Sequence, residues 1–424
     1  MALALIVALA GSGVCVGERS SAPLKQHLPN GLRLVIEDND HTATVVMSAL
    51  VRVTALHEPR GKTGIRQLTG MLVARGDACR ELLAQSGIRG DVVVAPDYIE
   101  LVLAAPVEAL DECARAMREM LFSPLFSEEA LRLTRDSLVR GLAAREEVPV
   151  GLAHRRLFDR IYPGVGAADG SAGDPIEVAQ LTLHDVRDFH AAHYLPNATV
   201  VAVSGGVEAT RARDALSQVM RGVLPGAPAR TRPEPQAGST EPVVIEVGGN
   251  TSVYAVGGRA VALSEPVYPA MAVGMTILGS GMGSRLYREL RVDRSVAYTI
   301  VSELTPGSTT PSGFVLVTCD TADLDEVQRV VDREIESMMS RPADPEQLQR
   351  AKQYLIGRHA LRRQRNQDIA HYLGVFELLG GVEGFRRGRQ LPGEIAAVSG
   401  QDVAEAMRRL FSPAWSVQLV ACND

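Results

Sequence analysis

The stretch LPGAPARTRPEPQAGSTEP, residues Leu224–Pro242, combines prolines, glycines and small polar residues near the middle of the 424-residue chain. This composition favours an extended, solvated linker over a helix or a strand. The linker divides the chain into an N-terminal domain, residues 23–223, and a C-terminal domain, residues 243–424. A linker in this position also prompts a search for duplication of one half in the other.

Short sequences of the first half recur in the second half in the same order and at nearly one offset. They are Leu110-Asp111-Glu112 with Leu324-Asp325-Glu326, Asp185-Val186 with Asp402-Val403, and Pro196 with Pro413. Each recurrence alone means nothing, because such short matches arise by chance. Together, at comparable places in the local pattern, they indicate an ancient tandem duplication.

Within each half the sequence predicts α+β structure. Runs of β-branched or alternating apolar residues between turn residues predict strands, at residues 32–36, 45–53, 98–104, 199–203, 314–318 and 416–420. Apolar residues repeating at three and four positions predict amphipathic helices, at residues 107–121, 128–144, 181–193, 324–339, 345–363 and 401–410.

The charge and cysteine content exclude several classes of protein. There are 44 basic and 50 acidic residues, giving a net charge of −6, and no basic cluster of the kind that nucleic-acid-binding proteins use. The 5 cysteines are scattered and odd in number, so they encode neither a zinc ribbon nor a paired disulfide framework. We expect no nucleic-acid partner.

Residues 1–22 resemble a leader. Residues 1–10 are continuously apolar and are followed by glycines and then by polar residues from Glu18 to Ser21. This apolar run is too short to span a bilayer as a helix, so no membrane span is expected. If residues 1–17 are a signal peptide the protein is periplasmic or secreted; otherwise it is cytoplasmic.

Several motifs resemble the pitrilysin or insulinase-type zinc metallopeptidases, in particular the branch similar to the mitochondrial processing peptidase. They are Leu28-Pro29-Asn30-Gly31-Leu32, Tyr194-Leu195-Pro196-Asn197, and Leu278-Gly279-Ser280-Gly281-Met282-Gly283-Ser284-Arg285-Leu286 followed by Arg291 and Ala297-Tyr298. The resemblance covers nearly the whole chain. It implies two homologous domains, each a mostly antiparallel sheet flanked by helices, that form a clam-like chamber around an extended peptide.

The zinc-binding signature of that family is absent. Its active members carry H-x-x-E-H on a helix, with two histidines as zinc ligands and a glutamate as general base, plus a distant glutamate as third ligand. The corresponding residues here are Arg66, Thr69 and Gly70, and the third ligand aligns with Gly141. Arginine cannot become a ligand, and threonine is no general base near neutral pH. We therefore expect no metal, no catalytic residue and no peptidase activity from this chain alone.

The second domain keeps a pair of residues that the family uses on substrate. By resemblance, Arg291 and Tyr298 would hold a peptide carbonyl or its oxyanion near the zinc of the catalytic assembly. This suggests a noncatalytic subunit that supplies a peptide clamp to a zinc-bearing homologous subunit. The alternative is an inactive peptide-binding or structural scaffold of the same fold. From spacing alone, Arg291 could equally be a solvated helix charge and Tyr298 a packing residue.

Two further patterns have simpler interpretations. His184, His190 and His193 lie on one predicted helix and could form a surface metal site, but no carboxylate or cysteine cluster completes it, so partly exposed helix histidines are the simpler interpretation. The glycine-rich residues 279–283 lack the Gly-Lys-Ser/Thr of a phosphate-binding loop and indicate a turn instead.

Overall fold

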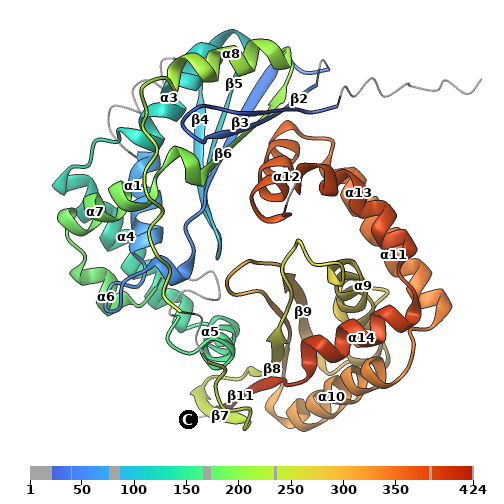
Figure 1. Cartoon of the computed structure of the whole chain (residues 1–424). Coiled ribbons are helices and arrows are strands. Elements are labelled where there is room, and N and C mark those ends of the chain that lie inside the picture. Colours follow the sequence, from blue (N-terminus) through green and yellow to red (C-terminus); the bar gives the residue numbers. More distant parts are fainter. Residues whose placement is uncertain are drawn as a thin grey trace, which may run out of the picture.

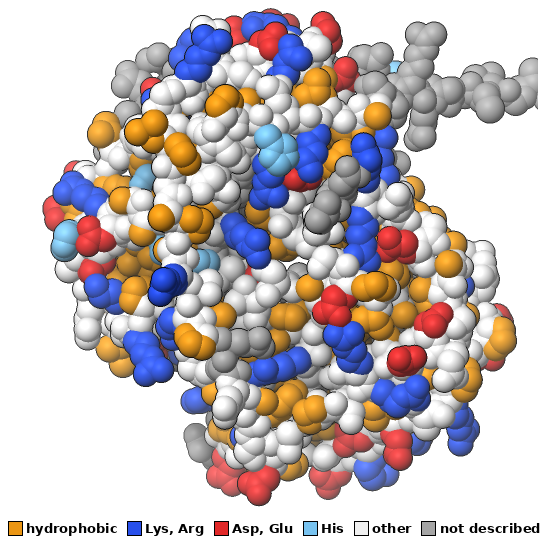
Figure 2. Space-filling model, viewed as in Figure 1, with side chains coloured by type: hydrophobic (Ala, Val, Ile, Leu, Met, Phe, Trp, Pro, Cys, Tyr) orange, Lys and Arg blue, Asp and Glu red, His pale blue; other side chains and the backbone are white. Residues whose placement is uncertain are grey.

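The computed structural model describes residues 22–39, 41–75, 86–165, 173–233, 236–381 and 384–422. The expected leader therefore lies almost entirely outside the described residues. Within these ranges, no helix has the length and apolar character needed to cross a membrane. Figure 2 shows apolar side chains scattered among charged ones over the visible face.

The first half contains a six-stranded sheet with the order β1-β2-β6-β3-β5-β4. Its strands are β1 (Leu24–His27), β2 (Arg33–Asp38), β3 (Thr44–Val51), β4 (Arg89–Val94), β5 (Ile99–Pro106) and β6 (Thr199–Gly205). Neighbouring strands are antiparallel, except that β2 and β6 are parallel.

The second half contains a five-stranded sheet with the order β7-β11-β8-β10-β9. Its strands are β7 (Val243–Gly248), β8 (Ser252–Arg259), β9 (Ala297–Thr305), β10 (Ser312–Cys319) and β11 (Trp415–Cys422). Here too a single pair, β7 with β11, is parallel. The order matches that of the first sheet without β1, which agrees with a duplication. The expected α+β fold, with two mostly antiparallel sheets flanked by helices, is confirmed (Figure 1).

The helices follow one another along the chain in a similar order in the two halves. In the first half they are α1 (Ile65–Arg75), α3 (Leu110–Phe122), α4 (Glu128–Glu146), α5 (Pro149–Ile161), α6 (Pro175–Gln180), α7 (Leu183–His193) and α8 (Ala209–Val219). In the second half they are α9 (Tyr268–Gly279), α10 (Leu324–Ser340), α11 (Pro345–Arg362), α12 (Asn366–Leu379), α13 (Gly384–Ala397) and α14 (Gly400–Phe411).

Two capping boxes explain one of the sequence recurrences. Thr182 caps α7 and Ser399 caps α14, and in each case the carboxylate of the third helical residue, Asp185 or Asp402, accepts a hydrogen bond from the backbone N–H of the cap. These reciprocal bonds satisfy backbone N–H groups that have no partner inside the helix. The recurring aspartates therefore start equivalent helices in the two halves.

Each half contributes one helix to the sheet of the other half. Helix α5 packs on β8 and β11 of the second sheet, and α12 packs on β3 and β6 of the first sheet (Figure 1). On α5, the Phe158 ring lies 5.7 Å from that of Phe314 in an edge-on contact. On α12, Gly374 lies so close to Leu50 that an added Cβ would come within 2.2 Å of its Cδ1.

Buried polar contacts also join the two halves. The Glu377 carboxylate on α12 lies 2.9 Å from the Lys25 ammonium. Asn39 donates to the side-chain oxygen of Asn366 over 2.7 Å. The backbone N–H of Ser308, in the turn between β9 and β10, donates to the Asp97 carboxylate over 2.8 Å. These contacts therefore hold the two halves directly against each other.

The secondary structure also differs from the prediction. The sequence analysis did not predict the outer strands β1, β4, β7 and β9, the inner strand β8, or helices α5, α9, α12 and α13. Strand β3 ends at Val51, where residue 53 was expected. The expected linker has no helix or strand among its described residues, yet it is not fully solvated, because the Trp415 indole donates to Gly238 O over 3.1 Å.

Replacing Phe158 by alanine should lower the free energy of unfolding by about 3–5 kcal/mol, because it leaves a cavity between the two halves. Denaturant unfolding measures this difference. The control is Leu133→Ala on α4, whose side chain is 53% exposed and which should change stability by less than about 0.5 kcal/mol. Equal effects of the two changes would contradict the role given to α5.

Candidate functional site

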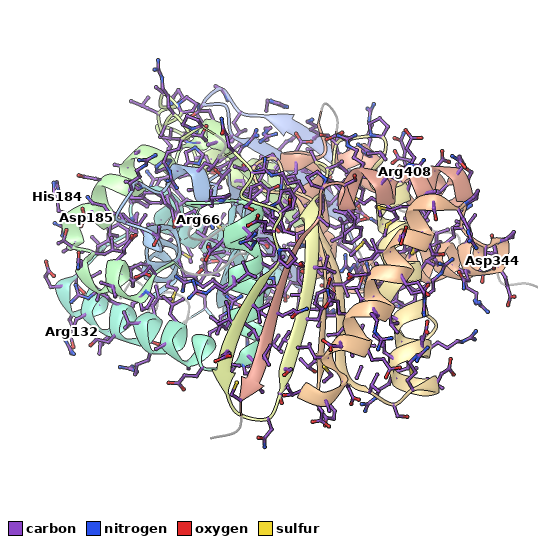
Figure 3. The ribbon with its side chains drawn as sticks, turned by 90° about the horizontal axis from the view of Figure 1, so that it is seen from below. Arg66, Arg132, His184, Asp185, Asp344 and Arg408 are labelled. Atoms are coloured by element: carbon purple, nitrogen blue, oxygen red, sulfur yellow. The ribbon has the colours of Figure 1, made fainter. Side chains whose placement is uncertain are left out.

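The residues in place of the zinc-binding motif lie on α1, which packs on β4. Arg66 and Thr69 are both buried, with 1% and 0% of their surface exposed. Figure 3 shows Arg66 inside the first half, whereas Arg132 and His184 point outward at its periphery. A fully buried arginine needs hydrogen-bond partners and a counter-charge.

Backbone carbonyl oxygens supply the partners of Arg66. Its Nη1 donates to Val53 O over 3.0 Å, to Ala95 O over 2.6 Å and to Pro96 O over 2.9 Å. These carbonyls come from the segment after β3 and from the turn between β4 and β5. Arg66 therefore ties two segments of the sheet to α1.

Glu58 supplies the counter-charge. Its Oε1 lies 3.7 Å from Arg66 Nε and accepts the backbone N–H groups of Gly64 and Arg66, each over 3.2 Å. Burial raises the pKa of the Glu58 carboxyl, and the charge of Arg66 opposes that rise. Burial likewise lowers the pKa of Arg66, which Glu58 opposes. The pair is a structural cross-link at the first ligand position.

Gly70 leaves no room for a second histidine ligand. A Cβ at this position would lie 3.2 Å from methyl groups of Val94 and Ile99 and 3.4 Å from one of Val92. The first carbon of any side chain would already be tightly packed against β4 and β5. A side chain here would therefore require these methyl groups to shift.

The remaining motif positions offer no ligand either. The Thr69 hydroxyl is buried and lacks a hydrogen-bond partner among the described residues, and a neutral hydroxyl is a poor substitute for a carboxylate base. Gly141 is exposed on α4, with no atom within 4 Å of an added Cβ. A catalytic zinc needs about three protein ligands. The residues at these positions therefore do not fit a zinc ion.

The histidines of α7 are not partly exposed as the sequence analysis expected. His190 and His193 are each only 9% exposed because they lie on the inner face of the helix. His190 Nε2 lies 3.0 Å from Leu121 O, and the His193 ring meets that of His57 edge-on at 4.9 Å. Burial lowers the pKa of both His190 and His193 to about 4.

His184 lies apart from them, with its side chain 83% exposed beside Asp188. Among the described residues, no group of three or more His, Cys, Asp and Glu side chains could hold a metal ion. The helix histidines therefore form no metal site with the described residues around them.

Arg291 contacts the backbone of the residue that precedes Tyr298, at the start of β9. Arg291 lies on the π-helical segment Tyr287–Asp293, and its Nη1 donates to Ala297 O over 2.6 Å. Tyr298 is 54% exposed, and a hydrogen bond to Asp320 raises the pKa of its hydroxyl. The guanidinium is thus fastened to the residue that precedes Tyr298.

The backbone around this pair is unusual. Ser295 has φ 57°, the one non-glycine residue with positive φ in the part of the chain that the structure describes. The β9–β10 register shifts at Thr318/Cys319, opposite Tyr298. Strained residues and bulges of this kind often aim side chains at functional sites.

The glycine-rich residues before this segment form the expected turn. Gly281 has φ 87°, and Ser284 Oγ donates to Gly281 O over 2.7 Å.

The Arg291–Tyr298 pair is distant from the contact between the halves. Along β9, Tyr298 and Thr305 are separated by roughly 23 Å at about 3.3 Å per residue. Beyond Thr305, Ser308 binds Asp97, whose charge acts on Arg66. The pair therefore lies at the opposite end of β9 from the contact with the first half.

The sequence analysis assigned no role to the buried carboxylates, which are Glu37, Glu58, Asp97, Glu100 and Glu377 among the described residues. Besides Glu58, Glu100 is 2% exposed and accepts Ser48 Oγ over 2.5 Å and His371 Nδ1 over 2.7 Å. A signal was present, because Glu100 is a charged residue in the otherwise apolar strand IELVLAAP. Charges in such strands need partners.

Comparisons with known proteins agree with this arrangement. Residues 180–355 match the family described as the peptidase M16 inactive domain. The non-peptidase homolog YmxG of Helicobacter pylori is 23% identical over 376 residues, covering 86% of this chain and 85% of that protein. The chain is thus similar over most of its length to M16 peptidases and to a non-peptidase homologue of them. The uncharacterized zinc protease YmxG of Bacillus subtilis is 19% identical and covers 92% of this chain and 96% of its own length.

Solved structures share the fold of this chain. A protease from Helicobacter pylori superposes with a TM-score of 0.84 at 15% identity, covering 94% of this chain and 99% of that one. A peptidase M16 inactive domain from Pseudomonas fluorescens gives 0.83 at 18% identity, covering 94% and 98%. These structures support the two-domain fold.

Replacing Arg66 by methionine should destabilise the protein by about 3–5 kcal/mol, because it leaves the buried Glu58 carboxylate without a counter-charge. The folded-state pKa of Glu58 should then lie further above its unfolded value. The loss should therefore be greater at pH 8 than at pH 5, where a protonated Glu58 favours folding. Chemical denaturation at both pH values measures it, with the exposed Arg132→Met as control. A change as small as that of the control would contradict the cross-link.

Acidification should weaken the fold through the buried histidines of α7. Because their folded-state pKa of about 4 lies below the ordinary value of 6.5, the stabilisation is complete above pH 6.5 and is lost as the pH falls toward 4. The change His193→Phe should flatten this pH dependence of unfolding, whereas His184→Phe should leave it unchanged. An unaltered slope in His193→Phe would refute the assignment.

Proposed function

We propose that this chain is the noncatalytic subunit of a heteromeric zinc peptidase and supplies a peptide clamp to a zinc-bearing homologous partner. In this proposal the zinc belongs to the partner, and the substrate is an unfolded or extended peptide. The observation that carries the proposal is the contrast between the two domains. The first has a cross-link where zinc ligands would be, and the second fastens Arg291 to the residue before the exposed Tyr298.

The chemistry of the pair suits a peptide carbonyl. A guanidinium carries five N–H donors, and the contact of Arg291 with Ala297 O leaves donors for a ligand. The Tyr298 hydroxyl, which donates to the Asp320 carboxylate, can exchange that acceptor for a carbonyl oxygen or an oxyanion. Donors held in place in this way stabilise developing negative charge better than mobile ones.

The position of Arg291 and Tyr298 supports the proposal that they contact a peptide bound at the zinc of a partner subunit. Within this chain, Tyr298 and the contact between Asp97 and Ser308 lie at opposite ends of β9. Exposed apolar residues next to the pair, Met282 at 79% and Val292 at 60%, suit contact with a second chain or a peptide.

The test is reconstitution with a homologue that carries His-x-x-Glu-His. An internally quenched peptide should be cleaved by the mixture and not by this chain alone, with or without added zinc. Arg291→Ala or Tyr298→Phe should lower turnover by about 10²-fold, the loss typical of a missing oxyanion donor. The matched control Arg294→Ala removes an exposed arginine of the same segment, which is paired with Glu289 and Glu326, and should retain activity.

Each result decides between the two hypotheses. Unchanged turnover in both Arg291→Ala and Tyr298→Phe would refute the clamp and favour the scaffold alternative. Zinc-dependent cleavage by the isolated chain, abolished by a chelator, would refute the noncatalytic assignment.

A further inference from the structure

A small cavity lies between helices α9, α11, α12 and α13, beside the end of β9. Its volume is about 210 Å³. Its apolar wall includes Leu263, Leu355, Phe376 and Ile395, all less than 9% exposed. Pockets for drug-sized ligands have roughly 300–1,000 Å³, so this cavity accepts one residue-sized group. An apolar cavity of this size favours an apolar side chain.

The rim of the cavity is cationic. Arg358, His359 and Arg362 of α11 and His371 of α12 all line it. In the part of the chain that the structure describes, Arg358 contacts the Tyr354 ring, and no carboxylate pairs with Arg358 or Arg362. The rim thus presents two guanidinium groups without a counter-charge.

The nearby carboxylates have other cationic partners. Glu37 pairs with Arg363 and Arg389, and Glu394 pairs with Arg387. Glu100 accepts His371 Nδ1, which leaves Nε2 as the free nitrogen of that ring. The charges of Arg363 and Arg362 act with burial to lower the pKa of His359. The local potential therefore suits an anion.

We propose that this cavity, the α11–α12 pocket, binds the C-terminal carboxylate of a peptide whose last side chain is apolar. The side chain fills the apolar wall, and the carboxylate meets the N–H groups of Arg358 and Arg362. Arginine pairs with carboxylates through two parallel hydrogen bonds, which gives geometric specificity as well as affinity. Charge complementarity and size together select this ligand.

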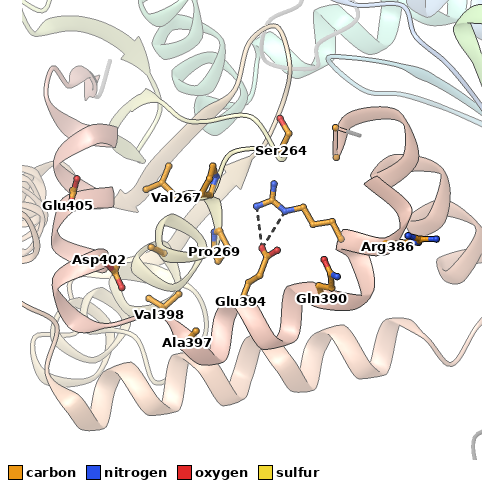
Figure 4. Close-up of a pocket in the computed structure, with 15 residues that line it drawn as sticks. Ser264, Val267, Pro269, Arg386, Gln390, Glu394, Ala397, Val398, Asp402 and Glu405 are labelled. Atoms are coloured by element: carbon orange, nitrogen blue, oxygen red, sulfur yellow. Dashed lines mark hydrogen bonds and ion pairs between the residues drawn. The ribbon is translucent and has the colours of Figure 1, made fainter. Parts of the chain in front are cut away.

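A larger cavity elsewhere in the second half lacks this selectivity. It has about 1200 Å³ and lies between α9, α13 and α14 (Figure 4). Its Arg387 is paired with Glu394 over 3.2 Å, and its Asp402 accepts the Ser399 backbone N–H. Two arginines and three carboxylates line it, so groups of both signs are present and its lining indicates no particular ligand charge.

The pocket is independent of the zinc partner, so its test uses this chain alone. Titration calorimetry with the peptide Ala-Ala-Ala-Leu should show binding. The same peptide with a C-terminal amide should bind at least ten-fold more weakly. The double change Arg358→Gln with Arg362→Gln should weaken binding of the free acid at least ten-fold. The control Arg350→Gln removes an arginine of the same helix that is paired with Glu346, and should have no effect.

A second variant tests the apolar wall without changing charge. Ala272→Leu should fill the cavity and abolish binding, while circular dichroism and thermal unfolding confirm the fold. Equal binding of acid and amide, or unchanged binding by the double arginine variant, would overturn the proposal. Tighter binding of octanoate than of the peptide would also overturn it, since the ligand would then be a fatty acid.

Discussion

The fold depends on the exchange of two helices between its halves. A sheet with two apolar faces needs cover on both, and each half supplies its own helices for one face only. Helix α12 covers β3 and β6 of the first sheet, and α5 covers β8 and β11 of the second. Neither domain can bury its sheet without the other. The relative position of the two domains is therefore set by core packing rather than by the linker.

The first domain owes its chemical inertness to packing as well as to composition. Arg66 is bound by three carbonyls and by Glu58 in the space next to α1, so it cannot turn away to admit a metal. Gly70 lies directly under the side chains of β4 and β5. Placing a zinc ligand set at these positions would require rebuilding the surroundings of α1.

In the second domain, polar side chains lie near both ends of β9. Arg291 and Tyr298 lie at its start, and Leu304 near its end lines the α11–α12 pocket. A strand aligns its residues at regular intervals, so an extended peptide is the ligand shape that matches such a surface. In the two proposals, a guanidinium beside an aromatic hydroxyl or an apolar wall would contact two different parts of a peptide.

Much of the architecture was accessible from local pattern. Helices α3, α4, α7, α10, α11 and α14 were predicted from their apolar spacing and caps. Strands β2, β3, β5 and β6 were predicted from their β-branched runs. Helices α5 and α12 were missed because their role is to bury the other half's sheet, which no short window reveals.

The sequence by itself determined the duplicated α+β order and the absence of zinc ligands at Arg66, Thr69 and Gly70, because spacing and residue type are local properties. Only the tertiary structure decided that Arg66 is a buried cross-link, that His190 and His193 are buried, and that Arg358 and Arg362 face an apolar cavity. These properties depend on burial and on contacts between segments distant in the chain, which sequence spacing does not encode.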